Sequence, residues 1–199
     1  FIFIGKYFDK PLAEIDDIDI DEFILSLDYL IPMYEQVQFG LGSVGIRLAR
    51  ICWNKNGWVS PSGSHGKATD PDLHEAKFGY GHEEWLFDTE KLIDGYHYGF
   101  LEPVRKQWQA YHGNVYDVVL YTIDGDTAKR FLVGKIKALE VLTQEQSDRV
   151  LDYYKTKEWF SEMEQEIRGS GANPDGFSTW QGVDLFNVRF LPETLELHE

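Results

Sequence analysis

Four titratable residues lie close together in the string GHEEWLFD: His82, Glu83, Glu84 and Asp88. Two neighbouring carboxylates could hold a magnesium ion or act as a general base. However, adjacent positions on a helix point about 100° apart, and acidic residues in the first turn of a helix are expected from the helix dipole alone. A magnesium-dependent nuclease or other hydrolase built on these four residues is therefore an alternative to our main hypothesis. One of the two glutamates could instead project into a binding pocket as a hydrogen-bond acceptor.

Two other motifs for catalysis or phosphate binding are incomplete. HEEWL is not the metalloprotease motif HExxH, because Leu86 stands where the second histidine would be. GSHGK resembles the end of a P-loop, but Pro61 replaces the first glycine and Ala68 follows the lysine. Cys52 is the single cysteine, which excludes an internal disulfide and a cysteine-rich zinc site. We therefore expect a binding protein with no catalytic residues, no metal and no cofactor.

Three of the six tryptophans, Trp53, Trp58 and Trp85, fall between residues 51 and 88, together with Tyr80. Glycines, serines and a proline surround them, so this segment, called here the aromatic loop, is predicted to be largely loop. Loops longer than about 12 to 15 residues in compact domains are often functional. Large aromatic side chains on such a loop either cover the core or line a pocket, and their polar neighbours favour the pocket.

Hydrophobic periodicity predicts the elements that hold the aromatic loop in place. The strongest strands are two runs joined by IDGDTAK, whose Asp124 and Gly125 favour a hairpin turn. Thr143 and Gln146 have the spacing of a capping box at the start of a helix. The predicted elements, in chain order, are strand 43–53, helix 83–93, strand 95–101, strand 115–123, strand 130–142, helix 143–169 and strand 184–190.

The chain has 199 residues, of which 43% are hydrophobic, enough for one large domain or one domain with an appendage. Residues 1–40 contain an apolar run at 1–4 and an amphipathic pattern at 20–38, so we predict an N-terminal helical appendage or linker there. Residues 41–199 are predicted to form the main domain. The sequence shows no signal peptide and no apolar run of about 18 residues, which predicts a cytoplasmic protein without a membrane segment.

The net charge of −15 argues against nucleic acid, because phosphates are bound by lysine and arginine. The distribution of this charge matters more than its sum. Residues 1–40 hold two basic and nine acidic side chains, and residues 151–199 hold four and ten, so the acid is concentrated in the two flanks. Within residues 41–70 one acidic residue stands against four basic ones: Arg47, Arg50, Lys55 and Lys67. The aromatic loop therefore begins on a locally basic strip.

Two parts of the sequence resemble known families. ICWNKNGWVSPSG, a downstream lysine and FGYGHEEWLFD resemble the amino-terminal part of bacterial proteins of modification-dependent restriction systems, which often carry an HNH nuclease domain. VYDVVLYTIDGDTAKRFLVGKIKALEVLT, followed by a helix and LFNVRF, resembles the second half of the PUA superfamily, which includes EVE, YTH, ASCH and SRA-like modules. The resemblance implies an α/β (α+β) fold, a PUA-like, strongly bent mixed β-barrel with flanking helices.

The function implied by the resemblance is recognition of a modified base in double-stranded DNA, flipped into an aromatic cage on the concave face of the barrel. Methylated or hydroxymethylated cytosine is the expected base. The module would target a defence nuclease that lies outside this chain, because no HNH metal motif is present in it. Flipping costs a few kcal/mol, which stacking at about 1–3 kcal/mol per base and hydrogen bonds to the base edge must offset. A protein-interaction module, indicated by the acidic flanks, is a second alternative.

Residues of the aromatic loop and its flanks suit such a reader. The expected base-binding residues are Trp53, Asn54, Trp58, Tyr80, His82, Glu83, Trp85 and Tyr98. The expected phosphate-binding residues are Arg47, Arg50, Lys55, Ser62 and Lys67. Walls of a preformed pocket are partly exposed in the free protein, and Trp85 is the tryptophan that we expect to be structural instead.

Overall fold

The computed structural model describes residues 45–198, and its central feature is a seven-stranded mixed sheet. The strands are β1 (Ile46–Ile51), β2 (Leu92–Ile93), β3 (Tyr96–Gly99), β4 (Val115–Ile123), β5 (Arg130–Val141), β6 (Val188–Phe190) and β7 (Leu195–Leu197). Their order is β1-β4-β5-β6-β3-β2, with β7 paired to β5. The β1–β4 pair is parallel and the others are antiparallel. Together with the helices, this sheet confirms the predicted α/β class.

The hairpin of β4 and β5 forms as predicted, with Ile123 opposite Arg130 next to the turn. Asp124 holds the turn, because its carboxylate accepts hydrogen bonds from residues 126 and 127. The backbone N–H of Gly125 donates to the carbonyl of Gly66 at 2.8 Å, which docks the hairpin turn onto the aromatic loop. Two register shifts along the pair are irregularities of the kind that bend and twist a strand.

The helices are short except for two near the C-terminus. They are α3 (His74–Phe78), η2 (His82–Trp85), α4 (Glu102–Lys106), α5 (Trp108–Tyr111), α6 (Gln144–Thr156), α7 (Trp159–Gly169), η3 (Phe177–Thr179), η4 (Gly182–Asp184) and η5 (Pro192–Thr194), where η marks a 3₁₀ turn. The predicted capping box opens α6, since the Thr143 hydroxyl accepts from the Gln146 N–H at 3.3 Å and the Gln146 side chain accepts from the Thr143 N–H at 2.7 Å. The predicted helix 143–169 is two helices, because Glu158 takes a left-handed conformation with φ of 64°.

Two further predicted elements differ from the structure. The helix predicted at 83–93 is wrong: η2 ends after one turn, and Leu92 and Ile93 instead pair with β3. The strand predicted at 184–190 is shorter, because η4 occupies its beginning and β6 starts at Val188. In both places a tertiary contact overrides the local pattern of apolar residues.

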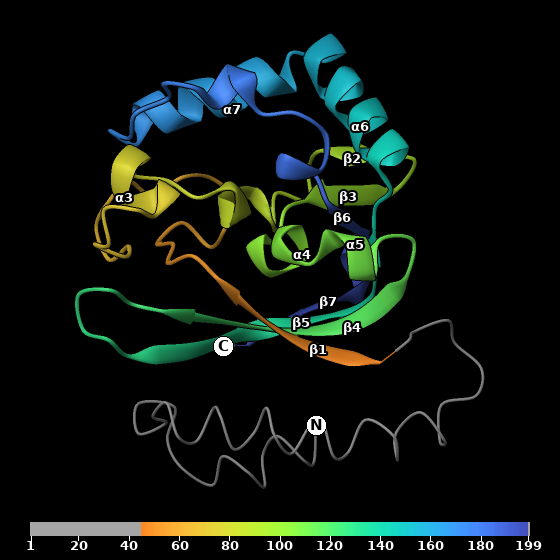
Figure 1. Cartoon of the computed structure of the whole chain (residues 1–199), viewed down its shortest axis with the longest axis horizontal. Coiled ribbons are helices and arrows are strands. Elements are labelled where there is room, and N and C mark those ends of the chain that lie inside the picture. The colour runs from red at the N-terminus through yellow and green to blue at the C-terminus, as the bar shows by residue number, and fades with distance from the viewer. Residues whose placement is uncertain (1–44, 199) are drawn as a thin grey trace, which may run out of the picture.

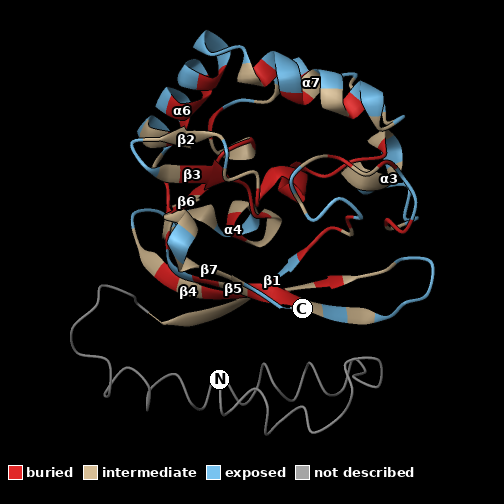
Figure 2. Ribbon diagram, turned by 180° about the vertical axis from the view of Figure 1, so that it is seen from behind, coloured by how far each residue is buried: buried red, intermediate tan, exposed pale blue. Residues whose placement is uncertain are grey.

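The elements lie in three levels (Figure 1). Helices α6 and α7 run along one side of the molecule, β1, β4, β5 and β7 lie on the opposite side, and β2, β3, β6, α4 and α5 lie between them. One core cluster packs inside the main sheet around Leu120 and Ile136. A second cluster packs under α6 and α7 around Tyr80, Leu151 and Phe177. Figure 2 shows that the outward surfaces of α6 and α7 are exposed, whereas buried residues fill the interior.

Strands β1 and β2 are the two edges of the sheet in the described part of the chain, so the sheet is open and the closed PUA-like barrel is not confirmed. The predicted appendage at 1–40, with its apolar run and amphipathic helix, lies outside the described residues.

No helix within residues 45–198 is both long enough and apolar enough to cross a membrane.

Candidate functional site

The most densely hydrogen-bonded side chain of the aromatic loop is Glu84, which is fully buried. Its Oε1 accepts from Asn54 Nδ2 at 2.7 Å and from the Ser62 backbone and hydroxyl at 2.9 and 3.1 Å. It also forms an ion pair with Lys67 Nζ at 2.8 Å, and its Oε2 accepts from the Gly81 N–H at 2.9 Å. We call these five residues the Glu84 network. Because these donors come from residues 54, 62, 67 and 81, the network ties distant parts of the aromatic loop together.

Asn54 extends the network and places Trp58. Its Oδ1 accepts from the N–H groups of Asn56 and Trp58 at 2.6 and 2.9 Å. Trp58 is held at φ of 56°, its indole N–H donates to the Cys52 carbonyl at 2.9 Å, and its ring packs on Phe87 at 5.8 Å. Trp58 therefore covers the main core rather than facing a cavity.

The five residues expected to bind phosphate do not form one surface. Lys67, only 2% exposed, and Ser62 belong to the Glu84 network, so neither is presented to a ligand. The Arg47 guanidinium lies over the Tyr116 ring at 4.9 Å. Arg50 is exposed, but it lies three positions after Arg47 on β1, and an odd spacing along a strand places side chains on opposite faces. Lys55 is exposed on the loop.

The expected aromatic cage is not assembled, because Trp53, Trp58 and Trp85 pack in three different places. Trp53 lies against Phe131 of β5 at 5.5 Å, and the backbone of Gly66 fills the space beside its ring, where a Cβ atom would collide with the indole. Trp85 is 5% exposed and sits in the cluster under α7, donating to Glu166 at 2.5 Å. Trp85 is thus buried, as expected of a structural residue.

Tyr80 and His82 come together with two residues outside the expected base-binding set, His74 of α3 and Trp180. The ring centroid of His74 lies 4.9 Å from that of Tyr80, 5.0 Å from that of His82 and 5.4 Å from that of Trp180. The Trp180 ring stands edge-on to His82 at 4.5 Å. We call these four residues the histidine box. Its rings come from three separate segments of the chain, and Phe100 and Phe177 flank them.

The histidine box contains three buried polar atoms that have no hydrogen-bond partner in the described structure: Nε2 of His74, Oη of Tyr80 and Nε2 of His82. Tyr80 is fully buried and His82 is 7% exposed, so solvent does not satisfy them. A buried polar group without a partner costs about 1–3 kcal/mol. Three such atoms on neighbouring aromatic rings are therefore a candidate ligand site.

Burial keeps both histidines of the box neutral. Burial lowers the pKa of His82 to about 3, and the nearby His74 adds to this effect. Burial also lowers the pKa of His74 to about 4, where Glu102 opposes the shift while Arg105 and Lys77 favour it. The box is thus an uncharged aromatic enclosure with cationic side chains around it, and Lys77 is exposed.

Trp180 closes the box from an exposed segment between α7 and η4. Gly171 and Gly176 of this segment take left-handed conformations with φ of 78° and 82°. Phe177 anchors the segment, because it is fully buried and stacks on Phe160 at 4.8 Å. Trp180 itself is half-buried. Trp180 is therefore more accessible to solvent than the buried Phe177 of the same segment.

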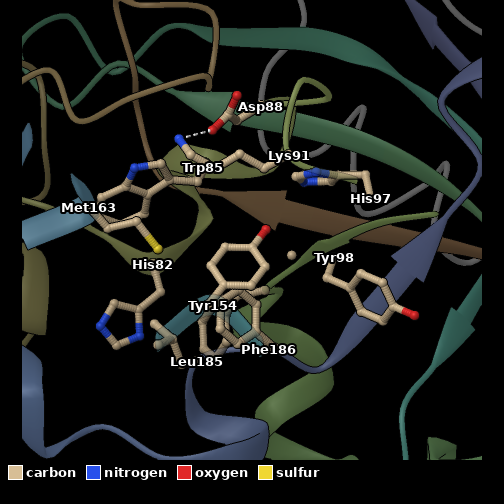
Figure 3. A pocket seen from close by; sticks show the side chains of 12 residues that line it. His82, Trp85, Asp88, Lys91, His97, Tyr98, Tyr154, Met163, Leu185 and Phe186 are labelled. Carbon is tan, nitrogen blue, oxygen red and sulfur yellow. Dashed lines mark hydrogen bonds and ion pairs between the residues drawn. The ribbon is translucent and has the colours of Figure 1, made fainter. Parts of the chain in front are cut away.

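A cavity beside the box reaches Tyr98, the last of the expected base-binding residues (Figure 3). Its volume is about 10 Å³, which is room for one water molecule. Both nitrogens of the buried His97 lack a partner there, and Lys91 closes one side through its ion pair with Asp88 at 2.7 Å. Tyr98 accepts from Arg189 at 3.3 Å. This cavity is too small for a base.

The acidic pair Glu83 and Glu84 offers little to a metal ion. Glu83 is buried and accepts from the N–H groups of Glu102 and Cys52 at 3.0 and 3.4 Å, while Glu84 is occupied by its network. Burial raises the pKa of Glu83 to about 7. Among residues 45–198 no three side chains of histidine, cysteine, aspartate or glutamate are grouped as metal ligands would be. Asp88 pairs with Lys91 instead.

Comparison with known proteins gives no further guide to the site: no family model, no curated protein and no solved structure matches this chain.

Proposed function

We propose that this domain binds double-stranded DNA that carries a modified base, and that the flipped base enters the histidine box. The observation that carries the proposal is the set of three buried, unpartnered polar atoms between aromatic rings. A flipped base needs flat apolar faces and a few hydrogen-bonding groups at its edge, and His74, Tyr80, His82 and Trp180 offer both.

The energetics favour this ligand over a purely apolar one. The free protein leaves three polar atoms unsatisfied, so a ligand that pairs with them recovers part of the cost already present. Stacking on Trp180 and the histidine rings adds about 1–3 kcal/mol per base. These terms together offset the few kcal/mol needed to unstack and unpair the base. A methyl or hydroxymethyl group would be sensed by the shape of the enclosure.

Trp180 has two roles in this proposal. In the free protein its ring covers the box, and on binding it turns outward and stacks on the inserted base. The exposed segment with its two left-handed glycines supports such a rearrangement, and the anchoring by Phe177 limits it to the segment's tip. Lys77, an exposed cation near the box, would contact a flanking phosphate in this proposal.

We further propose that the domain belongs to the PUA-like group and targets a defence nuclease carried on another domain or subunit. The bent β4–β5 hairpin, the mixed sheet and the helices on one side of it support the first part. The second part rests on the resemblance of the aromatic loop to modification-dependent restriction proteins. In this role the domain supplies recognition and the partner supplies cleavage.

The test is duplex binding by the full chain, using gel-shift titrations against matched duplexes with unmodified, methylated and hydroxymethylated cytosine and with methylated adenine. We expect tight binding to at least one modified duplex and weak binding to the unmodified one. Trp180→Ala should weaken that binding by about tenfold or more, because stacking on a base is lost, while the melting temperature falls by only a few degrees.

The matched control is Trp108→Ala, since Trp108 is also half-buried but packs on the main core and donates to the Leu142 carbonyl. This variant should bind as the wild type does once it is folded. Equal binding by the wild type and Trp180→Ala would reject the histidine box as the site. Tight binding to every duplex regardless of modification would reject the reader function.

A further inference from the structure

We infer that the histidine box selects cytosine, adenine and their modified forms, whose N4 or N6 amino group can donate a hydrogen bond, and rejects thymine and uracil, through the Nε2 atom of His82. This inference rests on the proposed function and makes it more specific. It follows from His82, because the fold determines which of its two ring nitrogens donates a hydrogen bond and which accepts one.

The backbone of η4 determines which nitrogen of His82 carries the proton. Nδ1 of His82 lies 3.0 Å from the carbonyl oxygen of Asp184. A carbonyl oxygen can only accept a hydrogen bond, so Nδ1 must donate and must carry the hydrogen. In a neutral imidazole the other nitrogen, Nε2, then has a free lone pair and can only accept.

The surroundings of His82 keep the ring in this neutral form. The side chain is buried among aromatic rings of Phe100, Phe177 and Trp180. The charged group that acts on it most clearly is Arg105, and its positive charge also disfavours a second proton on the ring. Consequently Nε2 remains a hydrogen-bond acceptor at neutral pH, and it is the acceptor that lacks a partner in the free protein.

An acceptor of fixed polarity distinguishes amino from carbonyl groups. Cytosine N4 and adenine N6 carry hydrogens that can be donated, whereas thymine and uracil present the O4 carbonyl at the corresponding place. A carbonyl facing His82 Nε2 would leave two acceptors opposed and both unpaired. Sites built to hydrogen-bond a substrate group discriminate strongly against analogues that lack it.

A rotatable hydroxyl does not give this selectivity. The Tyr80 hydroxyl can donate or accept, because its hydrogen rotates to suit the partner. It can therefore satisfy the ring nitrogen or carbonyl of any base, and it contributes affinity rather than discrimination. His82 is thus a specificity-determining residue, while Tyr80 and Trp180 bind what His82 selects.

The experiment compares 5-methylcytosine with thymine at one position of the same duplex. The two bases share their size and their methyl group and differ at the amino or carbonyl group and the neighbouring ring nitrogen. Each base is placed opposite an abasic site, so that neither base has to break a base pair before it flips. A second pair, adenine and hypoxanthine, repeats the comparison of amino with carbonyl in a purine. Binding is measured by fluorescence anisotropy.

We expect the wild type to bind the amino-bearing base of each pair about tenfold or more tightly. The key variant is His82→Asn, since the asparagine amide can still donate to the Asp184 carbonyl but has no group at the position of Nε2. Its preference for the amino-bearing base should fall to less than about threefold. Thermal unfolding of the variant checks that the fold is kept, and the wild-type preference is decisive even if the variant does not fold.

The outcomes separate this inference from the proposed function. Equal binding of both bases by the wild type would overturn the inference and leave the reader function standing. A preference that survives in His82→Asn would also overturn it, because another group would then be the selector. Failure to bind any of these duplexes or any modified duplex would overturn the proposed function and this inference together.

Discussion

The Glu84 network and the histidine box both contain buried polar groups of the aromatic loop, to which Trp180 is added in the box. They differ in how far their hydrogen-bonding groups are satisfied. Around Glu84, one carboxylate receives five hydrogen bonds, one of them from the buried Lys67. In the box, three polar atoms on neighbouring rings have no hydrogen-bond partner in the described structure. Proteins rarely leave such atoms unpaired, because the cost is comparable to a lost hydrogen bond.

Whether the buried polar groups have partners distinguishes a structural role from a binding role. The residue types alone do not make this distinction. GHEEW contributes to both regions, since Glu84 belongs to the network while His82, two positions earlier, belongs to the box. A satisfied polar cluster fixes the loop and has nothing left to offer a ligand. An unsatisfied one gains most when a ligand supplies the missing partners. Mutations can test each half of this contrast.

The largest effect is expected from Glu84→Ala. The change leaves the Lys67 ammonium buried without its counter-charge and removes the acceptor of Asn54, Ser62 and Gly81. Breaking a buried ion pair on one side typically costs about 3–5 kcal/mol, so the free energy of unfolding measured with urea should fall by that amount. Glu90→Ala, at an exposed position, is the control and should change stability by no more than about 0.5 kcal/mol. A loss as small as the control's would mean that the network is not structural.

A smaller and pH-dependent effect is expected from Glu83→Gln. Glu83 is buried beside the network and has no ion-pair partner among residues 45–198, and burial raises its pKa from 4.5 to about 7. The unfolded chain therefore loses this proton at lower pH than the folded one, and the wild type loses stability as pH rises through the window from about 4.5 to 7. Glutamine stays neutral, so the variant's stability relative to the wild type should rise across that window, on the order of 2–3 kcal/mol.

The measurement is urea unfolding of both proteins at several pH values, with Glu90→Gln as the control. A difference between Glu83→Gln and the wild type that stays constant with pH would show that Glu83 is charged and satisfied in the folded protein. Glu83 would then be a satisfied structural carboxylate, as Glu84 is.

The sequence predicted the regular parts of this fold because their determinants are local. Alternating apolar residues and the Asp124–Gly125 turn specify the β4–β5 hairpin, and Thr143 with Gln146 specifies the start of α6. Where tertiary contacts decide, the pattern misleads. The end of η2 and the break at Glu158 have no glycine or proline to mark them.

The candidate site was only half predictable for the same reason. Tyr80 and His82 stand out in an aromatic loop, but Trp180 reaches them from about a hundred residues further along the chain, and His74 sits in an ordinary helical pattern. Lys67 looked like a surface cation because lysine is rarely buried. Its burial depends on Glu84, seventeen residues away, and no local pattern shows that partnership.

The smallest effect, and the sharpest contrast with Glu84, is expected from Tyr80→Phe. The hydroxyl of Tyr80 is fully buried and has no partner in the described structure. Removing an unpaired polar atom while keeping the ring relieves a desolvation cost instead of breaking a bond, so the variant should be as stable as the wild type or more stable by up to about 1 kcal/mol. The same substitution at a satisfied tyrosine would be destabilising. Urea unfolding of Tyr80→Phe and the wild type gives the difference, and modified-duplex binding by the same samples should be weaker in the variant. A loss of stability above about 1 kcal/mol would reveal a hidden partner for the hydroxyl, and the histidine box would then resemble the Glu84 network, satisfied and structural.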